Sequence, residues 1–361
     1  MASGGCMLPD MNIAVIAITK GGVRLGRMLC ENSPEMQLYA SARYADQVDE
    51  MCTIFEPLEL KSLIYSLWKK LDGFVLIMAT GIVVRMIAPL LESKEIDPAV
   101  VVMDDAGRFA ISLLSGHLGG ANELAERCAL TVGAKTVVTT ATDTNNLPSF
   151  DMLAKEQGWL IDDINQVKTL NTLLLDDEEI AVMDITGQAL TWFNGRGRIK
   201  FYDTFSEAIK SRASGFLFVT NLQLPQHLSH EKLLILRPRN LVLGIGCNRG
   251  TKADEIEAVV IHQFNVLSLS LKSICTVATV AAKRDEAGLI EFAERLAVPL
   301  RCFESSELSL VAFPSHPSKH ALAAVGVAGV AEPAAILASG GGRLLLEKVK
   351  SGNVTLAVAE K

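Results

Sequence analysis

The strongest chemical signal in the chain is a histidine set between glycines, in the segment SGHLGGAN at 115–122. His117 comes just before an expected amphipathic helix at 118–132. Free backbone N–H groups at a helix start attract anions, and an imidazole titrates near neutral pH, so it can give or take a proton there. The pattern indicates a proton-transfer residue beside an anion, although a histidine that only caps the helix explains it equally well.

Three further polar segments lie next to expected strands in the first 143 residues. Residues 79–85 (ATGIVVR) follow a buried strand at 73–78, where open α/β sheets bind ligands, although an ordinary turn is the simpler interpretation. Residues 104–108 (DDAGR) are typical of a hairpin turn with solvated carboxylates. Residues 139–143 (TTATD) end a strand, and their hydroxyls and the Asp143 carboxylate could bind a ligand or, more simply, cap a helix.

The second half of the chain carries weaker signals. Residues 243–251 (LGIGCNRGT) match a dinucleotide-binding fingerprint poorly, because the third glycine is one position late and no ribose-binding acid follows. A glycine turn whose N–H groups and Arg249 hold carboxylates is the better interpretation. Lys283 follows an expected strand at 273–280 and could pair with a substrate carboxylate or lie in solvent. Glu332, the one charge in an apolar run, has either a capping or a functional role.

Alternating strand and helix patterns predict an α/β protein that positions these residues. After a disordered extension at 1–11, we expect an N-terminal doubly wound parallel-sheet domain at 12–143 and a small middle α/β domain at 144–237. A C-terminal α/β domain follows at 238–361. The pattern further predicts a helix at 57–70 with Leu58 facing inward, a hairpin around Asn194-Gly195 and a strand at 322–327.

Composition excludes several classes of protein. With 34 basic and 41 acidic residues the formal charge is −7, which argues against a nucleic-acid binder. Seven cysteines without a CxxC pair indicate reduced thiols, and no stretch is predicted to cross a membrane, so we expect a cytoplasmic protein. A serine nucleophile elbow, an HExxH pair and a GxxxxGK[ST] loop are missing, which weakens protease, metallohydrolase and NTPase interpretations.

Taken together, the motifs resemble the cobalt-precorrin-5A hydrolase (CbiG) family of anaerobic cobalamin biosynthesis. The resemblance covers both outer domains in the family's order, while the middle part matches only in position and length. The sequence departs from the pattern at Lys252 and around Ala281-Ala282. The segments that carry it are ATGIVVR (79–85), DPAVVVMDDAGRFAISLLSGHLGGANELA (97–125), TTATD (139–143), LGIGCNRGT (243–251), TVAAKRDEAGL (279–289) and VAEPAA (330–335).

This resemblance implies hydrolysis of a ring A δ-lactone on a cobalt-bearing macrocycle. The meso carbon and its methyl group then leave as acetaldehyde, which gives cobalt-precorrin-5B. The implied partners are the anionic cobalt-bearing tetrapyrrole and neighbouring cobalamin-pathway enzymes. Cobalt arrives with the substrate, so no metal or other cofactor of the protein itself is expected. The alternative is a carrier that binds a tetrapyrrole of the same pathway without catalysis.

Residues at the matching motifs give the expected site. We expect His117 to act as general base or acid, with Asp143 orienting it or handling a second proton, and Lys283 and Glu332 closing the pocket. Backbone N–H groups of Gly119 and Gly120 would stabilise an oxyanion. The expected substrate-binding residues are Lys20, Thr80, Gly81, Arg85, Arg108, Gly116, Gly119, Gly120, Asn122, Gly246, Arg249 and Thr251.

Overall fold

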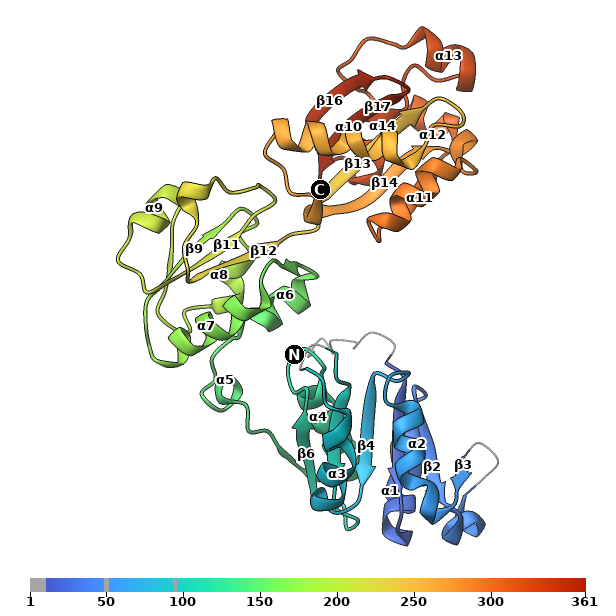
Figure 1. The fold of residues 1–361 in the computed structure, drawn as a ribbon, viewed down its shortest axis with the longest axis vertical. Helices are drawn as coiled ribbons and strands as arrows, with labels where there is room; N and C mark the ends of the chain where they lie inside the picture. Colours follow the sequence, from blue (N-terminus) through green and yellow to red (C-terminus); the bar gives the residue numbers. More distant parts are fainter. Residues whose placement is uncertain (1–10, 49–51, 94–95) are drawn as a thin grey trace. The chain divides into compact units, whose positions relative to one another are not determined.

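The computed structural model describes residues 11–48, 52–93 and 96–361. They form a first compact unit that ends at Met152 and a second that begins at Leu153. The first unit holds a seven-stranded sheet and the second holds two five-stranded sheets, drawn in Figure 1. The predicted α/β fold class is therefore confirmed. Of the expected disordered extension, residues 1–10 lie outside the described part, whereas Met11 is buried and packs into the first core.

The first sheet has the strand order β3-β2-β1-β4-β5-β6-β7. Strands β1 to β5 run parallel, and the order reverses direction between β1 and β4. β1, β4 and β5 are buried along their whole length, as expected for strands covered on both faces. The strands are β1 (Ile13–Ala17), β2 (Met36–Ser41), β3 (Thr53–Phe55), β4 (Gly73–Ile77), β5 (Ala99–Met103), β6 (Phe109–Leu114) and β7 (Lys135–Val137).

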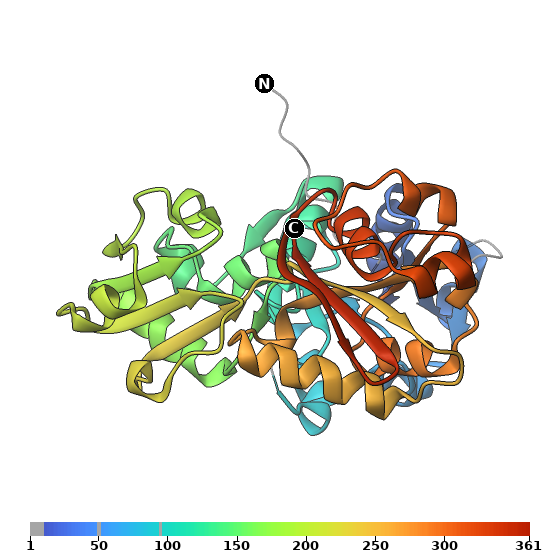
Figure 2. The same ribbon diagram turned by 90° about the horizontal axis from the view of Figure 1, so that it is seen from above.

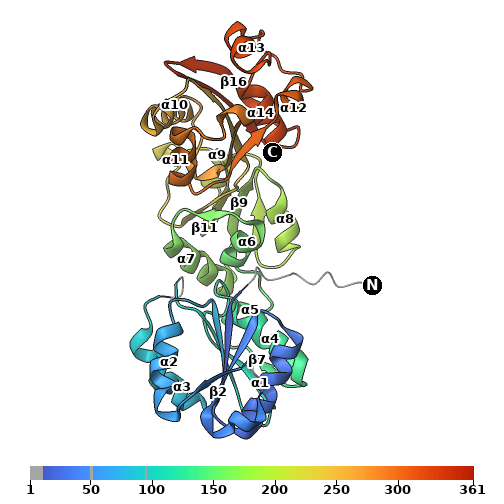
Figure 3. The same ribbon diagram turned by 90° about the vertical axis from the view of Figure 1, so that its right-hand side faces the viewer.

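Helices cover both faces of this sheet, which makes it doubly wound. α1 (Lys20–Asn32) and α4 (Ala121–Val132) supply one core layer, and α2 (Leu60–Leu67) and α3 (Thr80–Ile87) supply the other, as Figure 3 shows. Short turns complete the unit: η1 (Ala42–Gln47), η2 (Pro57–Glu59), η3 (Ala88–Leu90) and α5 (Ala141–Thr144). The prediction that Leu58 faces inward is wrong: it lies in η2, before the helix proper, and its side chain is 98% exposed.

Strand β6 reverses the direction of the chain, and this decides where the candidate residues lie. The predicted turn at 104–108 joins β5 to an antiparallel β6, so that Met103 pairs with Ala110 and Val100 with Leu114. β7 runs parallel to β6. Segments that follow β6 and β7 therefore lie at the edge where β1, β4 and β5 begin. Segments that follow β1, β4 and β5 lie at the opposite edge.

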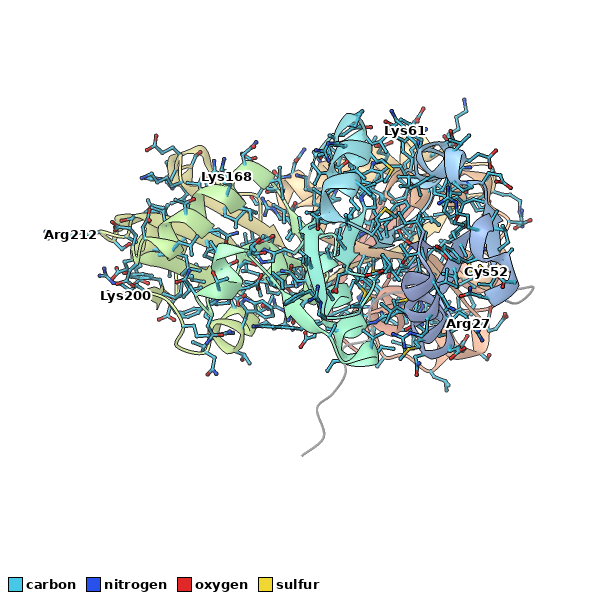
Figure 4. All side chains as sticks on the ribbon, turned by 90° about the horizontal axis from the view of Figure 1, so that it is seen from below. Arg27, Cys52, Lys61, Lys168, Lys200 and Arg212 are labelled. Atoms are coloured by element: carbon cyan, nitrogen blue, oxygen red, sulfur yellow. The ribbon has the colours of Figure 1, made fainter. Side chains whose placement is uncertain are left out.

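The middle sheet has the order β10-β9-β11-β12-β8. The predicted hairpin at Asn194-Gly195 is wrong, because β9 and β10 run parallel and Asn194, in the left-handed region at φ 45°, ends helix α8 between them. Figure 4 shows Lys168, Lys200 and Arg212 at the outside of this part. Its elements are α6 (Phe150–Gln157), β8 (Leu160–Ile161), α7 (Ile164–Leu175), β9 (Ile180–Asp184), α8 (Gln188–Phe193), β10 (Ile199–Phe201), α9 (Phe205–Lys210), β11 (Gly215–Val219), η4 (Gln226–Leu228) and β12 (Leu233–Arg237).

The C-terminal sheet has the order β15-β14-β13-β17-β16. Strands β13 to β15 are parallel, and β16 and β17 form a long antiparallel pair, red in Figure 2. Its strands are β13 (Leu241–Cys247), β14 (Ile274–Val280), β15 (Leu300–Phe303), β16 (Arg343–Ser351) and β17 (Val354–Glu360). Its helices are α10 (Ala253–Val266), η5 (Leu271–Ser273), η6 (Ala281–Lys283), α11 (Ala287–Arg295), α12 (Ser305–Ser309), α13 (Lys319–Val325) and α14 (Ala331–Ala338).

Two local features of this sheet concern the glycine motif after residue 243 and the strand predicted at 322–327. Helix α14 packs so closely on β13 that a methyl group on Gly244 would lie 1.8 Å from the Ala331 carbonyl oxygen, which explains a glycine in the motif. The strand predicted at 322–327 is wrong, because most of this segment belongs to α13. The Ser318 hydroxyl caps the start of this helix by accepting a hydrogen bond from the Ala321 N–H. An alanine-rich run favours a helix once such a cap is present.

Candidate active site

The loop between β6 and α4 presents His117 from a tightly closed turn. Gly120 N–H donates to the His117 carbonyl (3.0 Å), and Ala121 N–H donates to the Ser115 carbonyl (3.1 Å). Ser115 itself has a φ of 55°, a left-handed conformation that non-glycine residues adopt at a cost. Its hydroxyl donates to the Asp97 carbonyl (2.9 Å), which fixes the loop to the start of β5. The backbone that carries the imidazole is therefore strained at Ser115 and fixed by several hydrogen bonds.

The glycines of this loop are required by its geometry. A methyl group on Gly119 would lie 2.4 Å from the Ser115 Cβ, and one on Gly116 would lie 2.7 Å from the Asn122 Oδ1. Gly120, the capping residue just before α4, has a φ of 86°. One expected role changes: the Gly120 N–H donates to the His117 carbonyl, so it is engaged within the loop and does not point to an oxyanion.

The imidazole contacts two carboxylates, one on each side of the ring. His117 Nε2 lies 2.8 Å from Asp143 Oδ2, and Thr142 Oγ1 lies 3.3 Å from the same nitrogen. Nδ1 lies 3.5 Å from Asp151 Oδ2. Asn122 Nδ2 donates to the same Asp143 oxygen at 2.7 Å. The structure thus brings together three residues expected from the sequence (His117, Asn122, Asp143), because the ends of β6 and β7 lie at one edge of the sheet.

Burial and charge act on His117 in opposite directions. Its side chain is 14% exposed, against 44% for Asp143 and 6% for Asp151. Burial alone lowers the pKa of His117, but hydrogen bonds and charge attraction from the Asp151 and Asp143 carboxylates outweigh it. The pKa of His117 is therefore raised above the ordinary value for histidine. An imidazole of this kind is readily protonated near neutral pH and can return the proton to a substrate.

Two contacts of the imidazole escape sequence reasoning. Thr142 stands out only as part of the TTATD motif, and Asp151 lies where the expected middle domain carries weak chemical signals. Asp151 is in the first turn of α6, where acidic residues are common for electrostatic reasons alone. Nothing in the sequence pattern distinguishes it from an ordinary helix-start carboxylate.

An open hollow of about 570 Å³ adjoins the imidazole. Besides His117, Asn122 and Asp143 it is lined by the carboxylates Glu123 and Glu126. Among the described residues, the Asn122 Oδ1 and Glu123 Oε2 atoms are buried without a hydrogen-bond partner, which is uncommon for buried polar atoms.

Five other expected residues of the first unit lie at the opposite edge of the sheet. Lys20, Thr80 and Gly81 begin α1 and α3 directly after β1 and β4. Arg85 donates back along α3 to the Gly81 carbonyl (2.9 Å), and Arg108, at the start of β6, pairs with Asp104 (3.0 Å). The reversal of the chain at β6 separates them from His117. Their role in binding stays a prediction.

The expected C-terminal residues are mostly engaged with neighbouring groups. Arg249 and Asp285, both exposed, form an ion pair (3.1 Å), and the Thr251 hydroxyl donates to the Asn248 carbonyl (2.8 Å). Lys283 pairs with the buried Glu286 at 3.1 Å. These contacts order the turns that follow the strands of this sheet. The role of each residue in substrate binding stays a prediction.

Glu332 fastens one segment of the C-terminal part to another. Its side chain is 1% exposed, and its Oε1 accepts hydrogen bonds from the Ser315 hydroxyl (2.8 Å) and the Lys348 N–H (3.1 Å). These bonds give the carboxylate a structural role. A catalytic role for it stays a prediction.

A cavity of about 170 Å³ lies at the carboxyl end of β13 and β14. Gly246, Asn248 and Asn353 line it together with three lysines. Lys283 is paired, Lys348 donates to the His316 carbonyl (2.9 Å), and Lys350 is exposed. Ligands of open α/β sheets bind outside the carboxyl ends of strands, and lysines there favour an anion.

Metal-ligand clusters and membrane-spanning helices are both absent from the described part of the chain. Within 11–48, 52–93 and 96–361, no group of three or more His, Cys, Asp or Glu side chains could hold a metal ion. Among these same residues, every helix is too short or too polar to cross a bilayer.

Three family models match successive parts of the chain. "Cobalamin synthesis G N-terminal" matches residues 62–143, "Cobalamin biosynthesis central region" matches 148–238, and "Cobalamin synthesis G C-terminus" matches 241–359. The three matches follow one another along the chain.

Named relatives match over almost the whole length. The cobalt-precorrin-5A hydrolase of Priestia megaterium is 36% identical, over 96% of this chain and 94% of the relative. That of Salmonella typhimurium LT2 is 31% identical, over 96% and 97%. The probable cobalt-precorrin-5A hydrolase of Methanocaldococcus jannaschii is 24% identical, over 80% and 85%. The chain, as its motifs predicted, belongs to the cobalt-precorrin-5A hydrolase (CbiG) family, and it is a hydrolase of cobalamin biosynthesis.

Proposed function

We propose that this enzyme opens the ring A δ-lactone of cobalt-precorrin-5A and releases acetaldehyde, which leaves cobalt-precorrin-5B. The observation that carries the chemistry is the His117–Asp143 pair, 2.8 Å apart beside an open hollow. One partner is mostly buried and the other is 44% exposed, so the pair connects an ordered imidazole to a surface that a substrate can reach.

The first step is hydrolysis of the lactone. A water oxygen adds to the acyl carbon, the acyl C–O bond breaks, and the ring A acetate becomes a free carboxylate. The departing oxygen stays on the meso carbon and takes up a proton. In this step Asp143 or neutral His117 accepts the proton from water, and the imidazolium form of His117 supplies the proton to the departing oxygen.

The second step is cleavage of a carbon–carbon bond. The new hydroxyl loses its proton to the His117–Asp143 pair, and the O–H electrons form the C=O bond of acetaldehyde. The bond from the meso carbon to the macrocycle breaks, its electron pair stays on the macrocycle, and that macrocycle carbon takes up a proton. One water is consumed and one acetaldehyde leaves, so the macrocycle loses C2H2 in total.

Anchoring of the substrate's many carboxylates falls to basic and backbone groups. The lysine-lined cavity of the C-terminal part, about 170 Å³, suits a carboxylate group by its size and charge. Arg249 is the exposed guanidinium that we assign to a further carboxylate, whereas Arg85, Arg108 and Lys20 lie at the edge of the first sheet opposite His117 and are not assigned. Cobalt belongs to the substrate, and the proposal includes no cofactor of the protein.

A non-catalytic carrier is the less favoured function. A carrier needs groups that bind anions, but it has no use for an imidazole held between two carboxylates. The relatives named as hydrolases also favour catalysis.

The test is turnover of cobalt-precorrin-5A with acetaldehyde measured by a coupled dehydrogenase. His117→Ala is compared with His262→Ala, which changes an exposed histidine on α10. We expect His117→Ala to reduce turnover by a factor on the order of 10² to 10⁴, the usual contribution of a general acid or base, and His262→Ala to match the wild type. Acetaldehyde release by His117→Ala at the wild-type rate would remove this histidine from the mechanism.

A further inference from the structure

We propose that Asp151 is the positioning residue of His117: its carboxylate holds the Nδ1–H, so that Nε2 is the nitrogen that exchanges protons with the substrate. The inference rests on the proposed function, because it assigns a direction to the same imidazole. It adds a residue from α6, outside every motif that carried the family resemblance.

The contacts of the imidazole ring show which of its two nitrogens faces the substrate. Asp151 Oδ2 lies 3.5 Å from Nδ1, on the opposite side of the ring from Asp143 and Thr142. Asp151 is 6% exposed and Asp143 is 44% exposed. A buried carboxylate is out of reach of a macrocycle, whereas an exposed one is not. The Nε2 side is therefore the substrate side.

The position of Asp151 is itself well fixed. It follows Phe150, whose side chain is fully buried, in the first turn of α6. Carboxylates are favourable at this end of a helix. The imidazole on the other side belongs to the closed loop at 115–121, so both partners are held by backbone structure and not by flexible side chains.

The chemical consequence follows from the two ring nitrogens. Both nitrogens of the imidazolium carry a hydrogen, and each faces a carboxylate, Asp151 at Nδ1 and Asp143 at Nε2. The hydrogen on the buried Asp151 side stays in place, whereas the one on the exposed Asp143 side can pass to the substrate and return. The same use of a buried aspartate is known from Ser-His-Asp triads, where its loss leaves the wrong tautomer and reduces kcat severely. In this chain the buried carboxylate would similarly hold the Nδ1–H and orient the ring, so that proton exchange takes place at Nε2.

Other charged groups near His117 must be considered in any test by pH. Asp143 approaches from α5 and Asp151 from α6, while Glu123 and Glu126 of α4 line the same hollow. These other carboxylates remain when Asp151 is replaced. A change in the titration of His117 then reports on Asp151 specifically only if an equal substitution elsewhere leaves it unaltered.

The experiment compares Asp151→Asn, Asp151→Glu and a control, Asp184→Asn. Asp184 is a structural carboxylate of the middle sheet, which accepts hydrogen bonds from the Thr186 N–H and hydroxyl and the Ala189 N–H. Turnover of cobalt-precorrin-5A is measured over pH. The titration of His117 is followed by NMR, with its signal assigned from the spectrum of His117→Ala.

We expect Asp151→Asn to lower kcat by a factor on the order of 10² with little change in KM, and to lower the pKa of His117. Asp151→Glu should restore part of kcat, and Asp184→Asn should change neither quantity, whatever its thermal stability. A merely structural Asp151 would lower Tm in Asp151→Asn but leave the titration and the pH profile of the folded enzyme as in the wild type, which overturns the inference.

The two proposals fail in different ways. A wild-type enzyme that does not turn over cobalt-precorrin-5A sinks the proposed function, while the NMR titration still decides whether Asp151 holds the imidazole. An active wild type, together with an Asp151→Asn enzyme of equal kcat and unchanged His117 titration, sinks only the role of Asp151.

Discussion

Replacing Gly119 by alanine should reduce catalysis by displacing the backbone of the His117 loop, although no catalytic side chain is replaced. The added Cβ would lie 2.4 Å from the Ser115 Cβ and 2.7 Å from the Ser115 carbonyl oxygen. Neither atom can rotate away, because one is backbone and the other is attached directly to it. The loop must therefore open, which breaks the bond from the Ala121 N–H to the Ser115 carbonyl.

The expected magnitude follows from this clash. Forcing one methyl group into a packed site costs about 1–3 kcal/mol of stability. Displacement of a catalytic group by about 1 Å can reduce turnover on the order of 10²-fold. We therefore expect Gly119→Ala to fold with reduced stability and to lose kcat by about that factor.

Gly133→Ala provides the matched control. Gly133 caps the C-terminal end of the same helix and has a φ of 74°, and a methyl group added to it would meet no atom of the described residues within 4 Å. Its only penalty is the left-handed backbone, about 1–2 kcal/mol. Both variants should lose similar stability in chemical denaturation, but only Gly119→Ala should lose acetaldehyde release. A Gly119→Ala enzyme with wild-type kcat would refute the role assigned to this loop.

Three further predictions concern charge and metal. Asp143→Asn should lower the pKa of His117, because it removes one of the two carboxylates that raise it. Since the folded pKa lies above the ordinary value, the His117–Asp143 pair stabilises the folded protein below about pH 6.5, and this stabilisation is lost as the pH rises through the folded pKa. After allowance for the exposure of Asp143, the wild type should be more stable than Asp143→Asn by about 1 kcal/mol near pH 5 in urea denaturation, and this difference should shrink as the pH rises through the folded pKa. A difference that stays constant with pH would contradict this. Arg249→Ala should raise KM and leave kcat and Tm nearly unchanged, since its partner Asp285 is exposed; an unchanged KM would exclude it from binding. Dialysis against EDTA should leave turnover intact, and activity that returns only on adding metal would show a cofactor that the proposal omits.

The sequence is sufficient for the buried parallel strands of the first sheet and for the glycines of the His117 loop, because both follow from local patterns. Burial of β4 and β5 on both faces is visible as unbroken apolar runs. Even the turn at 104–108 is predictable. Its consequence is harder to see from the sequence: a strand that runs back after this turn carries His117 to the edge opposite Arg85 and Arg108.

Two kinds of feature could not be predicted. Asp151 is 34 residues from His117 in the chain, and only tertiary packing brings its carboxylate to the imidazole, so no local spacing reveals it. The segment at 322–327 is alanine- and valine-rich and compatible with either a strand or a helix. The Ser318 cap decides for a helix, and its effect depends on where the chain turns.

The most direct test of the account is incubation of the wild-type enzyme and His117→Ala with cobalt-precorrin-5A, followed by mass analysis of the macrocycle and assay of acetaldehyde. We predict a net loss of C2H2 from the macrocycle, with one acetaldehyde released for each product, in the wild type and not in His117→Ala. A macrocycle that binds to the wild type and leaves with its mass unchanged would contradict the account and indicate a carrier.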